Sequence, residues 1–274
     1  MAAHLESKPP PLLLGDGEAH LWFADPEEIG DPALLSQYVD LLSEEERAQY
    51  QRYRFEKDRR LHLVSHALAR VALSRYAPVR PEEWTFAHNA HGKPRVAGPR
   101  VGRALRFNLA HTRGMVMCGV VREAEIGVDV EDMERKSDTQ GIARRFFSAP
   151  ERSALEALPE GERRDRFFSL WTLKEAYVKA RGMGLSIPLN QFAFHFGEDG
   201  AVAAAFDERL GDSADGWGFG VLSPSPERRA AIAVRILNQG VVRVHVRRTV
   251  PLIREEALPC RLLCRSERLA GGGV

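Results

Sequence analysis

Two acidic residues alternate with apolar residues in segment 126–131, whose sequence is Ile-Gly-Val-Asp-Val-Glu. Successive side chains of a β-strand point to opposite faces, so Asp129 and Glu131 would project together while the apolar residues are buried. Two carboxylates this close repel each other unless they are solvated, protonated or bridged by a cation. Oxygen ligands of this kind favour magnesium or another hard divalent metal. For this segment taken alone, the alternative is a solvated edge strand.

A second set of charged side chains follows on a predicted helix. One broad face of that helix would hold four residues at offsets of zero, three, four and eight: Trp171, Lys174, Glu175 and Lys179. A face packed on the core normally excludes charges. These side chains therefore form a Glu175–Lys179 pair at the surface, or they line a polar site. The turn at 182–185 favours the polar site, because its glycines let the backbone approach a ligand closely.

Basic groups that would suit a phosphate are spread over the first half of the chain. Lys93 lies in a Gly-Lys-Pro turn, and His111 ends a predicted strand. Lys57 and Arg60 stand in a basic cluster just before a predicted helix. Each group by itself is more often solvated or structural. Together they could clasp phosphate groups.

The elements that position these groups follow from hydrophobic periodicity and turn signals. Strands are predicted at 20–23, 84–87, 105–108, 115–121, 126–130, 192–196, 230–237 and 241–246, and helices at 43–52, 61–76 and 163–181. Ser43 with Glu46, and Ser148 with Glu151, are capping-box signatures that open helical stretches. The second half thus repeats the order of the first. We expect a duplicated α+β unit with a cleft between the copies, the alternative being that two common boxes coincide.

These elements divide the chain into four predicted parts. Residues 1–18 form a loose N-terminal lead-in, residues 19–123 an N-terminal α+β half, and residues 124–250 a C-terminal α+β half. Residues 251–274 are expected to be a peripheral or disordered tail.

Composition excludes several classes of protein. The 274 residues include 39 basic and 38 acidic side chains, and a net charge of +1 lacks the basic footprint of a nucleic-acid binder. Three cysteines form neither a disulfide framework nor a zinc motif. Because no apolar run has the length of a membrane span and the N-terminus lacks the pattern of a signal peptide, we expect no membrane partner and a cytoplasmic protein.

Four segments, taken in order, resemble the signatures of the surfactin-type phosphopantetheinyl transferase family. They are the GKP turn at 92–94, the FNLAH segment at 107–111, the GVDVE strand at 127–131 and the WTLKEAYVK helix at 171–179. The match spans roughly residues 43 to 196. Four motifs in the right order are far more specific than any one of them.

The resemblance implies a fold and an activity. The fold would be α+β, with two similar halves related by a pseudo-two-fold axis and coenzyme A in the cleft between them. The enzyme would be a monomeric 4'-phosphopantetheinyl transferase, or holo-[acyl-carrier-protein] synthase. It would move 4'-phosphopantetheine from coenzyme A to a serine of an acyl, peptidyl or aryl carrier protein and release 3',5'-adenosine bisphosphate.

The resemblance also implies roles for individual residues. Asp129, Glu131 and Glu175 would hold Mg²⁺, with Mn²⁺ as a substitute, against the coenzyme A pyrophosphate. Glu175, Glu131 and Lys179 would be catalytic, with Glu175 as the base, directly or through a bound water, and Glu131 as the runner-up.

Further residues would bind coenzyme A. Besides Asp129, these are Lys93, His111 and Lys179 at the phosphates and, with weaker support, Lys57 and Arg60 near the nucleotide 3'-phosphate. The family often has a serine where this chain has Ala110, so one hydroxyl contact to coenzyme A would be missing.

Two other hypotheses remain open from the sequence. One is another magnesium-dependent phosphoryl transferase, although the chain lacks the glycine-rich GK(S/T) loop of P-loop enzymes. The other is a catalytically silent module of the same fold that binds carrier protein or coenzyme A. For carrier recognition we expect the segment 131–166, where Arg144 and Arg145 would face an acidic carrier.

Overall fold

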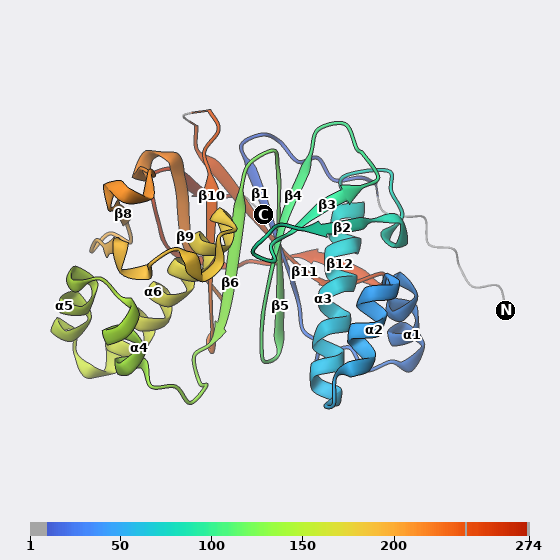
Figure 1. Ribbon diagram of the computed structural model, residues 1–274, viewed down its shortest axis with the longest axis horizontal. Coiled ribbons are helices and arrows are strands. Elements are labelled where there is room, and N and C mark those ends of the chain that lie inside the picture. The colour runs from blue at the N-terminus through green and yellow to red at the C-terminus, as the bar shows by residue number, and fades with distance from the viewer. Residues whose placement is uncertain (1–9, 239, 273–274) are drawn as a thin grey trace.

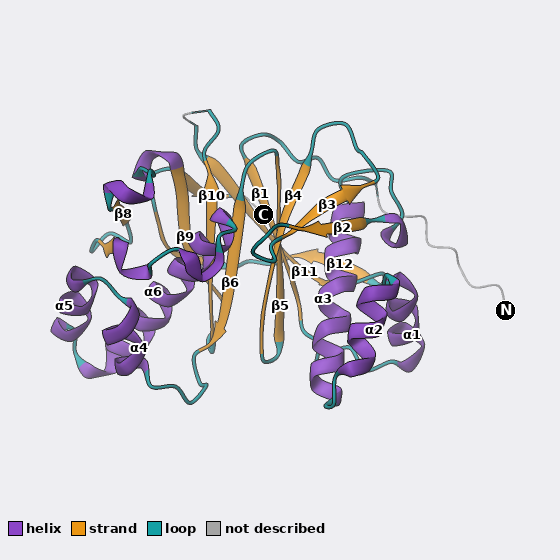
Figure 2. Ribbon diagram, in the orientation of Figure 1, coloured by secondary structure: helices purple, strands orange, loops and turns teal. Residues whose placement is uncertain are grey.

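The computed structural model describes residues 10–238 and 240–272 and shows a mixed α+β protein (Figures 1 and 2). The first half contains β1 Glu18–Ala24, α1 Pro32–Leu41, α2 Glu44–Arg52, α3 Glu56–Ser74, β2 Thr85–His88, β3 Pro94–Gly98, β4 Leu105–Thr112 and β5 Met115–Arg122. The second contains β6 Ile126–Asp132, α4 Thr139–Phe146, α5 Ala149–Ala157, α6 Glu160–Arg181, β7 Phe192–Phe196, β8 Val202–Phe206, β9 Trp217–Ser225 and β10 Arg228–Arg235. Over these described ranges both halves run from one strand through three α-helices to four strands. The repeated order of a strand, a capping box, a long helix and further strands is the one that the sequence predicts.

Two sheets form the middle of the molecule, and the helices cover their outer faces (Figure 1). Four more strands follow: β11 Val242–Val250, β12 Arg254–Ala257, β13 Arg261–Arg265 and β14 Leu269–Gly271. One sheet has the order β12-β11-β1-β5-β4, with β14 also paired to β11, and the other has the order β13-β9-β10-β6. A shared core, including Leu21, Val128 and Ile232, packs between the sheets. The layers are therefore helix, sheet, sheet and helix, and each half buries its apolar helix stripe on its own sheet.

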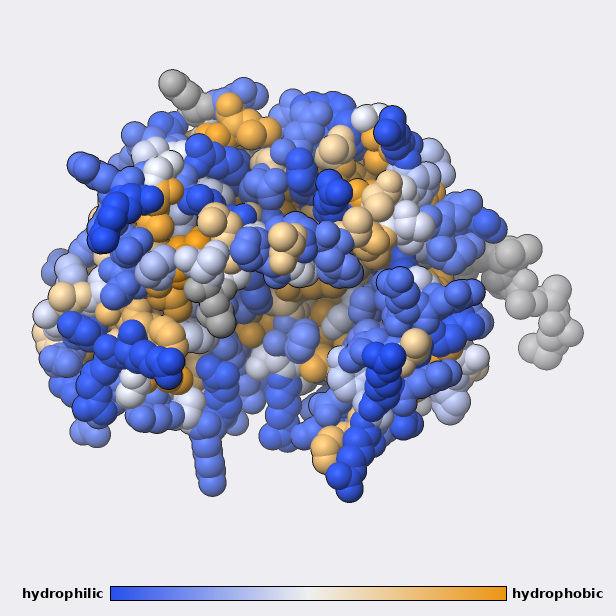
Figure 3. Space-filling model, in the orientation of Figure 1, coloured by the Kyte–Doolittle hydropathy of each residue, from blue (hydrophilic) through white to orange (hydrophobic). Residues whose placement is uncertain are grey.

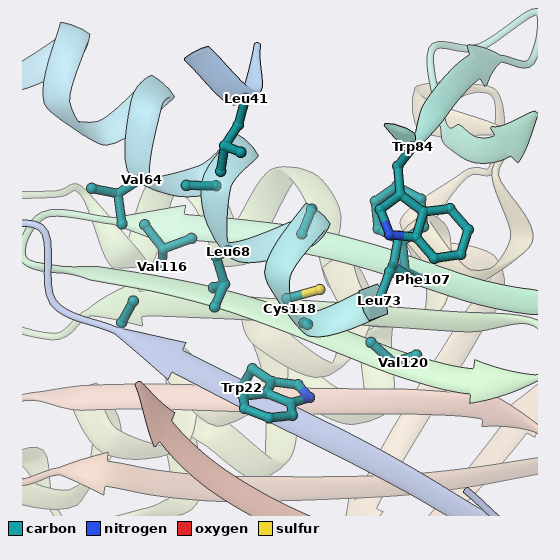
Figure 4. Packing of buried hydrophobic residues seen from close by; sticks show 14 of the residues in the cluster. Trp22, Leu41, Val64, Leu68, Leu73, Trp84, Phe107, Val116, Cys118 and Val120 are labelled. Carbon is teal, nitrogen blue, oxygen red and sulfur yellow. The ribbon is translucent and has the colours of Figure 1, made fainter. Parts of the chain in front are cut away.

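The core of the first half lies between α3 and its sheet (Figure 4). Val64 and Leu68 on α3 pack towards Trp22 of β1 and Val116 of β5, and all four are completely buried. The stripe has helical spacing, so its burial fixes the rotation of α3 about its own axis. The second half repeats this arrangement with α6 against β9 and β10.

Both capping boxes predicted from the sequence are present. Ser43 and Glu46 cap α2, and Ser148 and Glu151 cap α5, each with the two reciprocal hydrogen bonds of the motif. The two glutamates also accept bonds from buried cations of the long helices: Arg70 for Glu46 and Lys174 for Glu151. The boxes therefore join each short helix to the long helix beside it.

The C-terminal tail is the clearest difference from the sequence prediction. Residues 251–274 were expected to be peripheral or disordered, but they contain β12 Arg254–Ala257, β13 Arg261–Arg265 and β14 Leu269–Gly271. Strand β13 pairs with β9 in one sheet, whereas β14 pairs with β11 in the other. The tail thus adds strands to both sheets, and its backbone groups pair with strands that would otherwise be left with unpaired groups. Residues 273–274 lie outside the described residues.

Two further assignments are corrected. Strand β11, Val242–Val250, was placed in the C-terminal half, but it pairs in parallel with β1 in the sheet of the first half. The predicted lead-in 1–18 falls partly outside the description, since residues 1–9 are not described. From residue 10 the chain is held against the first half by Leu12 N, which donates to Arg75 O at 2.7 Å, and by the buried side chain of Leu14.

Among the described helices, none combines the length and apolar character needed to span a bilayer.

Candidate active site

Strand β6 presents its acids away from the core between the sheets. Ile126, Val128 and Val130 are buried in that core, as the alternation predicts. Asp129, on the opposite face, is only 7% exposed and lies beneath α6. The solvated edge strand considered as an alternative is therefore wrong.

Gly127 lets α6 come close to this face of the strand. A Cβ atom at position 127 would lie 2.0 Å from the carbonyl oxygen of Ala176 and 2.3 Å from the nitrogen of Ala180. No side chain fits there without moving the helix. The glycine of the strand motif thus sets the distance between β6 and α6, and with it the distance between their charged groups.

The acids of β6 meet partners from α6. Asp129 Oδ1 accepts a hydrogen bond from Lys179 Nζ at 2.7 Å. Glu131 Oε1 accepts one from Trp171 Nε1 at 3.0 Å and lies 3.2 Å from Arg135 Nη2. Trp171 was predicted on the polar face of the helix, and the structure adds its contact with Glu131; Arg135 was not predicted as a site residue.

The electrostatics show that three carboxylates share this site. Burial and then the negative charge of Asp129 raise the pKa of Glu131 to about 7. The same two causes raise the pKa of Glu175 above its ordinary value, although Lys179 opposes the shift. Asp129 therefore acts on both glutamates, as expected for like charges held close together in a partly buried place.

The donor set fits a hard divalent cation. Asp129 Oδ2 is buried and has no hydrogen-bond partner among the described residues. All the candidate ligands are carboxylate oxygens, which magnesium prefers over nitrogen or sulfur ligands. The oxygens of Asp129, Glu131 and Glu175 do not all lie within 4.8 Å of one another. A bound cation would interact with this unpaired buried oxygen and would offset the repulsion that raises the pKa values of the two glutamates.

Lys174 has a different place from its neighbours on the motif helix. Its side chain is fully buried, and Nζ donates to Leu189 O at 2.8 Å and Phe192 O at 2.7 Å and pairs with Glu151 at 2.8 Å. The expectation that a core-facing position excludes this charge is wrong, because these acceptors compensate its desolvation. The helix therefore turns Lys174 into the core and presents Glu175 and Lys179 to the site.

Strand β4 brings a histidine to the same place. His111 is exposed at the end of β4, but partial desolvation lowers its pKa, and the charge of Lys179 lowers it further while Asp129 opposes the shift. Asn108 Oδ1 accepts from Val128 N at 2.9 Å, and Thr112 Oγ1 accepts from Asp132 N at 3.2 Å. These two bonds fasten β4 of the first half to β6 of the second.

Ala110 does not take part in the site. Its side chain is 3% exposed and belongs to the core between the sheets. Because neighbouring side chains of a strand alternate, Ala110 points away from His111. The expected loss of a hydroxyl contact to coenzyme A stays a prediction.

A pocket of about 400 Å³ adjoins His111 on the side of the first half. Its walls come from α3 and from strands β2 to β4, and they include His62, His66, Phe86 and Phe107. Burial and then the charge of His66 lower the pKa of His62 to about 4. The space-filling view shows this face of the molecule hollowed between the two halves (Figure 3).

Three of the predicted basic residues lie apart from the acidic cluster. Lys93 Nζ donates to Glu125 at 2.8 Å and to Ala180 O at 2.7 Å, so it joins its turn to the end of α6. Asn89 reinforces this contact by donating to Gly182 O at 2.7 Å. Lys57 is exposed above the ring of Phe55. Arg60 is half-buried, and its Nε has no hydrogen-bond partner among the described residues.

The structure thus brings together five of the eight predicted site residues: His111, Asp129, Glu131, Glu175 and Lys179. They come from β4, β6 and α6, where both halves meet. Carboxylates, a lysine and a histidine beside a pocket form a set of side chains suited to the binding of phosphate groups.

Comparison with known proteins gives the family. Residues 125–234 match the model of the 4'-phosphopantetheinyl transferase superfamily, and residues 31–121 match that of the 4'-phosphopantetheinyl transferase N-terminal region. The chain is 34% identical over 180 residues to the 4'-phosphopantetheinyl transferase HetI of Nostoc, covering 65% of this chain and 75% of that one. It is 32% identical over 166 residues to the transferase Sfp of Bacillus subtilis, covering 61% and 71%. The chain belongs to the 4'-phosphopantetheinyl transferase family.

A solved structure, the holo-[acyl-carrier-protein] synthase of Thermotoga maritima, aligns with 54% of this chain and 98% of its own length. The sequence identity is 18% and the TM-score 0.35, a likeness too distant to bear on the site.

Proposed function

We propose that this enzyme transfers 4'-phosphopantetheine from coenzyme A to a serine of an acyl, peptidyl or aryl carrier protein. The observation that supports this most is the convergence of Asp129, Glu131 and Glu175 with Lys179 and His111. A cluster of this kind suits a pyrophosphate that must be bound, aligned and broken. Family membership supplies the identity of the donor and the acceptor.

The reaction replaces a phosphoanhydride bond by a phosphodiester bond. The serine oxygen forms a bond to the β-phosphorus of coenzyme A, and the bond from that phosphorus to the bridging pyrophosphate oxygen breaks. The leaving group is 3',5'-adenosine bisphosphate, and the serine proton must go to a base. Catalysis depends on positioning the two oxygens in line and on neutralising their charge.

Glu175 is the base in this proposal. It has no hydrogen bond or ion pair with the described residues, whereas Glu131 is held by Trp171 and Arg135. Its raised pKa brings a carboxylate closer to the basicity needed for a hydroxyl proton at neutral pH. Glu131, with a pKa of about 7, is the second candidate.

Asp129, Glu131 and Glu175 would hold a magnesium ion. When bound, the ion supplies positive charge that stabilises the oxygens of the pyrophosphate. Lys179, released from Asp129 Oδ1, and His111 would then contact the phosphate groups. The charge on Lys179 acts on the same oxygens and therefore favours departure of the nucleotide.

The nucleotide part of coenzyme A would occupy the pocket of about 400 Å³ beside His111. Phe86 and Phe107 offer aromatic surface for a base, and His62 and His66 offer polar contacts. Lys57 and Arg60 lie at the start of α3 and would attract the 3'-phosphate. The contact of Lys93 with Ala180 O supports a role in fixing the end of α6 more than a role in binding a phosphate group.

The remaining parts of the proposal concern location and assembly. We propose a monomer in the cytoplasm, where the free thiols of Cys118, Cys260 and Cys264 stay reduced. Light scattering coupled to size exclusion at micromolar concentration would test the monomer.

The decisive experiment is intact-protein mass spectrometry of a panel of apo carrier proteins incubated with the enzyme, coenzyme A and Mg²⁺. We expect one carrier or more to gain the mass of one phosphopantetheine group, and a chelator to prevent the gain. Absence of any gain, with coenzyme A still bound in a calorimetric titration, would contradict the proposal and favour a silent binding module.

A further inference from the structure

A second cluster of ionisable side chains lies on β1, outside the site described above. Glu18 and His20 are two residues apart, so both point to the face of β1 that is turned away from the core between the sheets. Strand β11 runs parallel to β1, and its register places His245 directly beside His20. Three side chains from two distant parts of the chain therefore meet on one face of the sheet.

The distances within the cluster suit ligands of one ion. His20 Nε2 lies 3.6 Å from Glu18 Oε2, and His245 Nε2 lies 3.7 Å from Glu18 Oε1. Ligand atoms of all three residues lie within 4.8 Å of one another. A tetrahedral zinc ion with bonds of about 2.1 Å holds its ligand atoms about 3.4 Å apart. The observed separations are longer than good hydrogen bonds and close to this value.

An unpaired buried nitrogen points into the cluster. The His20 side chain is only 6% exposed, and its Nε2 has no hydrogen-bond partner among the described residues. The Nε2 atom of His245 is also buried and unpaired in the described part of the chain. Buried polar atoms of proteins nearly always have a partner, so two such nitrogens facing one carboxylate call for an explanation.

The other nitrogen of His20 is fixed by a neighbour. Nδ1 lies 2.8 Å from the hydroxyl of Tyr76, which also accepts a hydrogen bond from Trp22 Nε1 at 2.8 Å. A hydrogen bond at the second ring nitrogen orients the ring, as it does in metal-binding histidines.

The surroundings leave the cluster accessible. Glu18 and His245 keep 31% and 30% of their side-chain surface exposed, which gives an ion a path from solvent. The charge of Arg247 acts on His20, but its guanidinium lies over the ring of Trp22 and 3.7 Å from Glu255. Trp22 and Glu255 therefore interact with much of the positive charge of Arg247.

We propose that Glu18, His20 and His245 bind a divalent transition-metal ion, with zinc as the best fit. Two imidazole nitrogens and one carboxylate are a ligand set that zinc accepts, with water in the fourth position. The ion would join β1 to β11 and thereby fasten the C-terminal part of the chain to the first strand. Its ligands differ in kind from the all-oxygen set on β6, so the two places would select different metals.

The test uses the full-length protein, stripped of metal with a chelator and then dialysed. Zinc is titrated in the presence of millimolar Mg²⁺, and bound zinc per chain, the melting temperature and the visible spectrum of the cobalt-substituted protein are measured. We expect one zinc per chain, a higher melting temperature, and a cobalt spectrum of tetrahedral type.

Three variants separate the proposal from unspecific binding. His245→Ala and Glu18→Gln should each weaken zinc binding at least tenfold and remove the shift in melting temperature. The matched control His195→Ala, an exposed histidine on β7, should bind as the wild type does. Magnesium-dependent transfer should persist in all three variants, so failure of this proposal and failure of the proposed function give different results.

Two results would overturn the proposal. One is absence of stoichiometric zinc from the wild type, which would leave an ordinary cluster of ion pairs. The other is zinc binding that is unchanged in both His245→Ala and Glu18→Gln, which would place the ion elsewhere.

Discussion

Strands β1 and β6 open the two halves of the protein, and their comparison shows how one arrangement can hold different chemistry. Each strand turns alternate apolar residues, such as Leu21 and Val128, into the core between the sheets. On the opposite face, β6 has Asp129 and Glu131, whereas β1 has Glu18 and His20. Strand β1 lies between β11 and β5, whereas β6 ends its sheet beside β10. The difference in ligand chemistry therefore comes both from side-chain identity and from the elements beside each strand.

The two long helices show a related difference. On α3, Arg70 reaches the capping-box glutamate Glu46 beside a pocket. On α6, Lys174 reaches the capping-box glutamate Glu151 in a fully buried core. In the second half the capping box therefore stabilises the helix that bears Glu175. In the first half the capping-box residue Glu46 lines the pocket beside α3. We expect substitutions in the two halves to separate activity from stability.

The largest expected effect is on catalysis and tests the assignment of the acidic chemistry to the second half. Glu175→Gln should lower kcat/KM for transfer about 10³-fold, about 4 kcal/mol, because it removes the base and weakens a metal ligand. The measurement is the rate of release of 3',5'-adenosine bisphosphate, with an unchanged melting curve as evidence of folding. Glu162→Gln, on an exposed part of the same helix, serves as the control. A loss below threefold in Glu175→Gln would remove this residue from the mechanism.

The next effect is on stability and concerns the buried capping box. Lys174→Met should lower the free energy of unfolding by about 3–5 kcal/mol, because it leaves Glu151 buried without its cation. Urea denaturation gives the value. Lys179→Met, one turn later on the same helix and 30% exposed, should cost much less stability and mainly weaken coenzyme A binding. Equal losses in the two variants would contradict the division between core and site.

The capping box of the first half should respond to acid. Burial opposes ionisation of Glu46, but the hydrogen bond and charge of His66 and the charge of Arg70 outweigh it and lower the pKa of Glu46 to about 2. Its contribution to stability is present above the unfolded-state value of 4.5 and is lost as the pH falls through about 2. The full loss is about 3 kcal/mol.

Urea denaturation between pH 6 and pH 2 would measure this dependence. We expect a flatter profile in Glu46→Gln than in the wild type, and a wild-type slope in Glu45→Gln, its exposed neighbour. Superimposable profiles for Glu46→Gln and the wild type would show that the His66 and Arg70 contacts do not hold in solution.

The smallest of these effects tests the packing of β6 against α6. Gly127→Ala should cost about 1–3 kcal/mol, because its Cβ would overlap the backbone of Ala176. Gly30→Ala, where a Cβ would meet nothing within 4 Å, is the matched control. Chemical denaturation of both variants gives the free energies of unfolding to be compared. If Gly127→Ala is as stable as the control, α6 can move outward from β6. The rate of transfer should then fall, because Lys179 and Glu175 move with the helix.

Much of the fold followed from local patterns. The alternation at 126–130, the helical spacing at 163–181 and both capping boxes were predicted correctly, since each depends on neighbours only a few residues away. Helices α1 and α4 and strands β3, β8, β9 and β12 to β14 were missed. Strands β13 and β14 pair with β9 and β11, which are remote in sequence, so no local pattern shows these pairings.

The sequence by itself determined the family motifs, the repeated order of elements and the grouping of Asp129 with Glu131 and of Glu175 with Lys179. These depend on strand and helix periods, which are properties of the backbone. The tertiary structure decided that Lys174 is buried, that Lys93 holds the end of α6, and that His245 lies beside His20. Such contacts arise only when sheets and helices pack, because burial and strand register bring together residues that no local pattern relates.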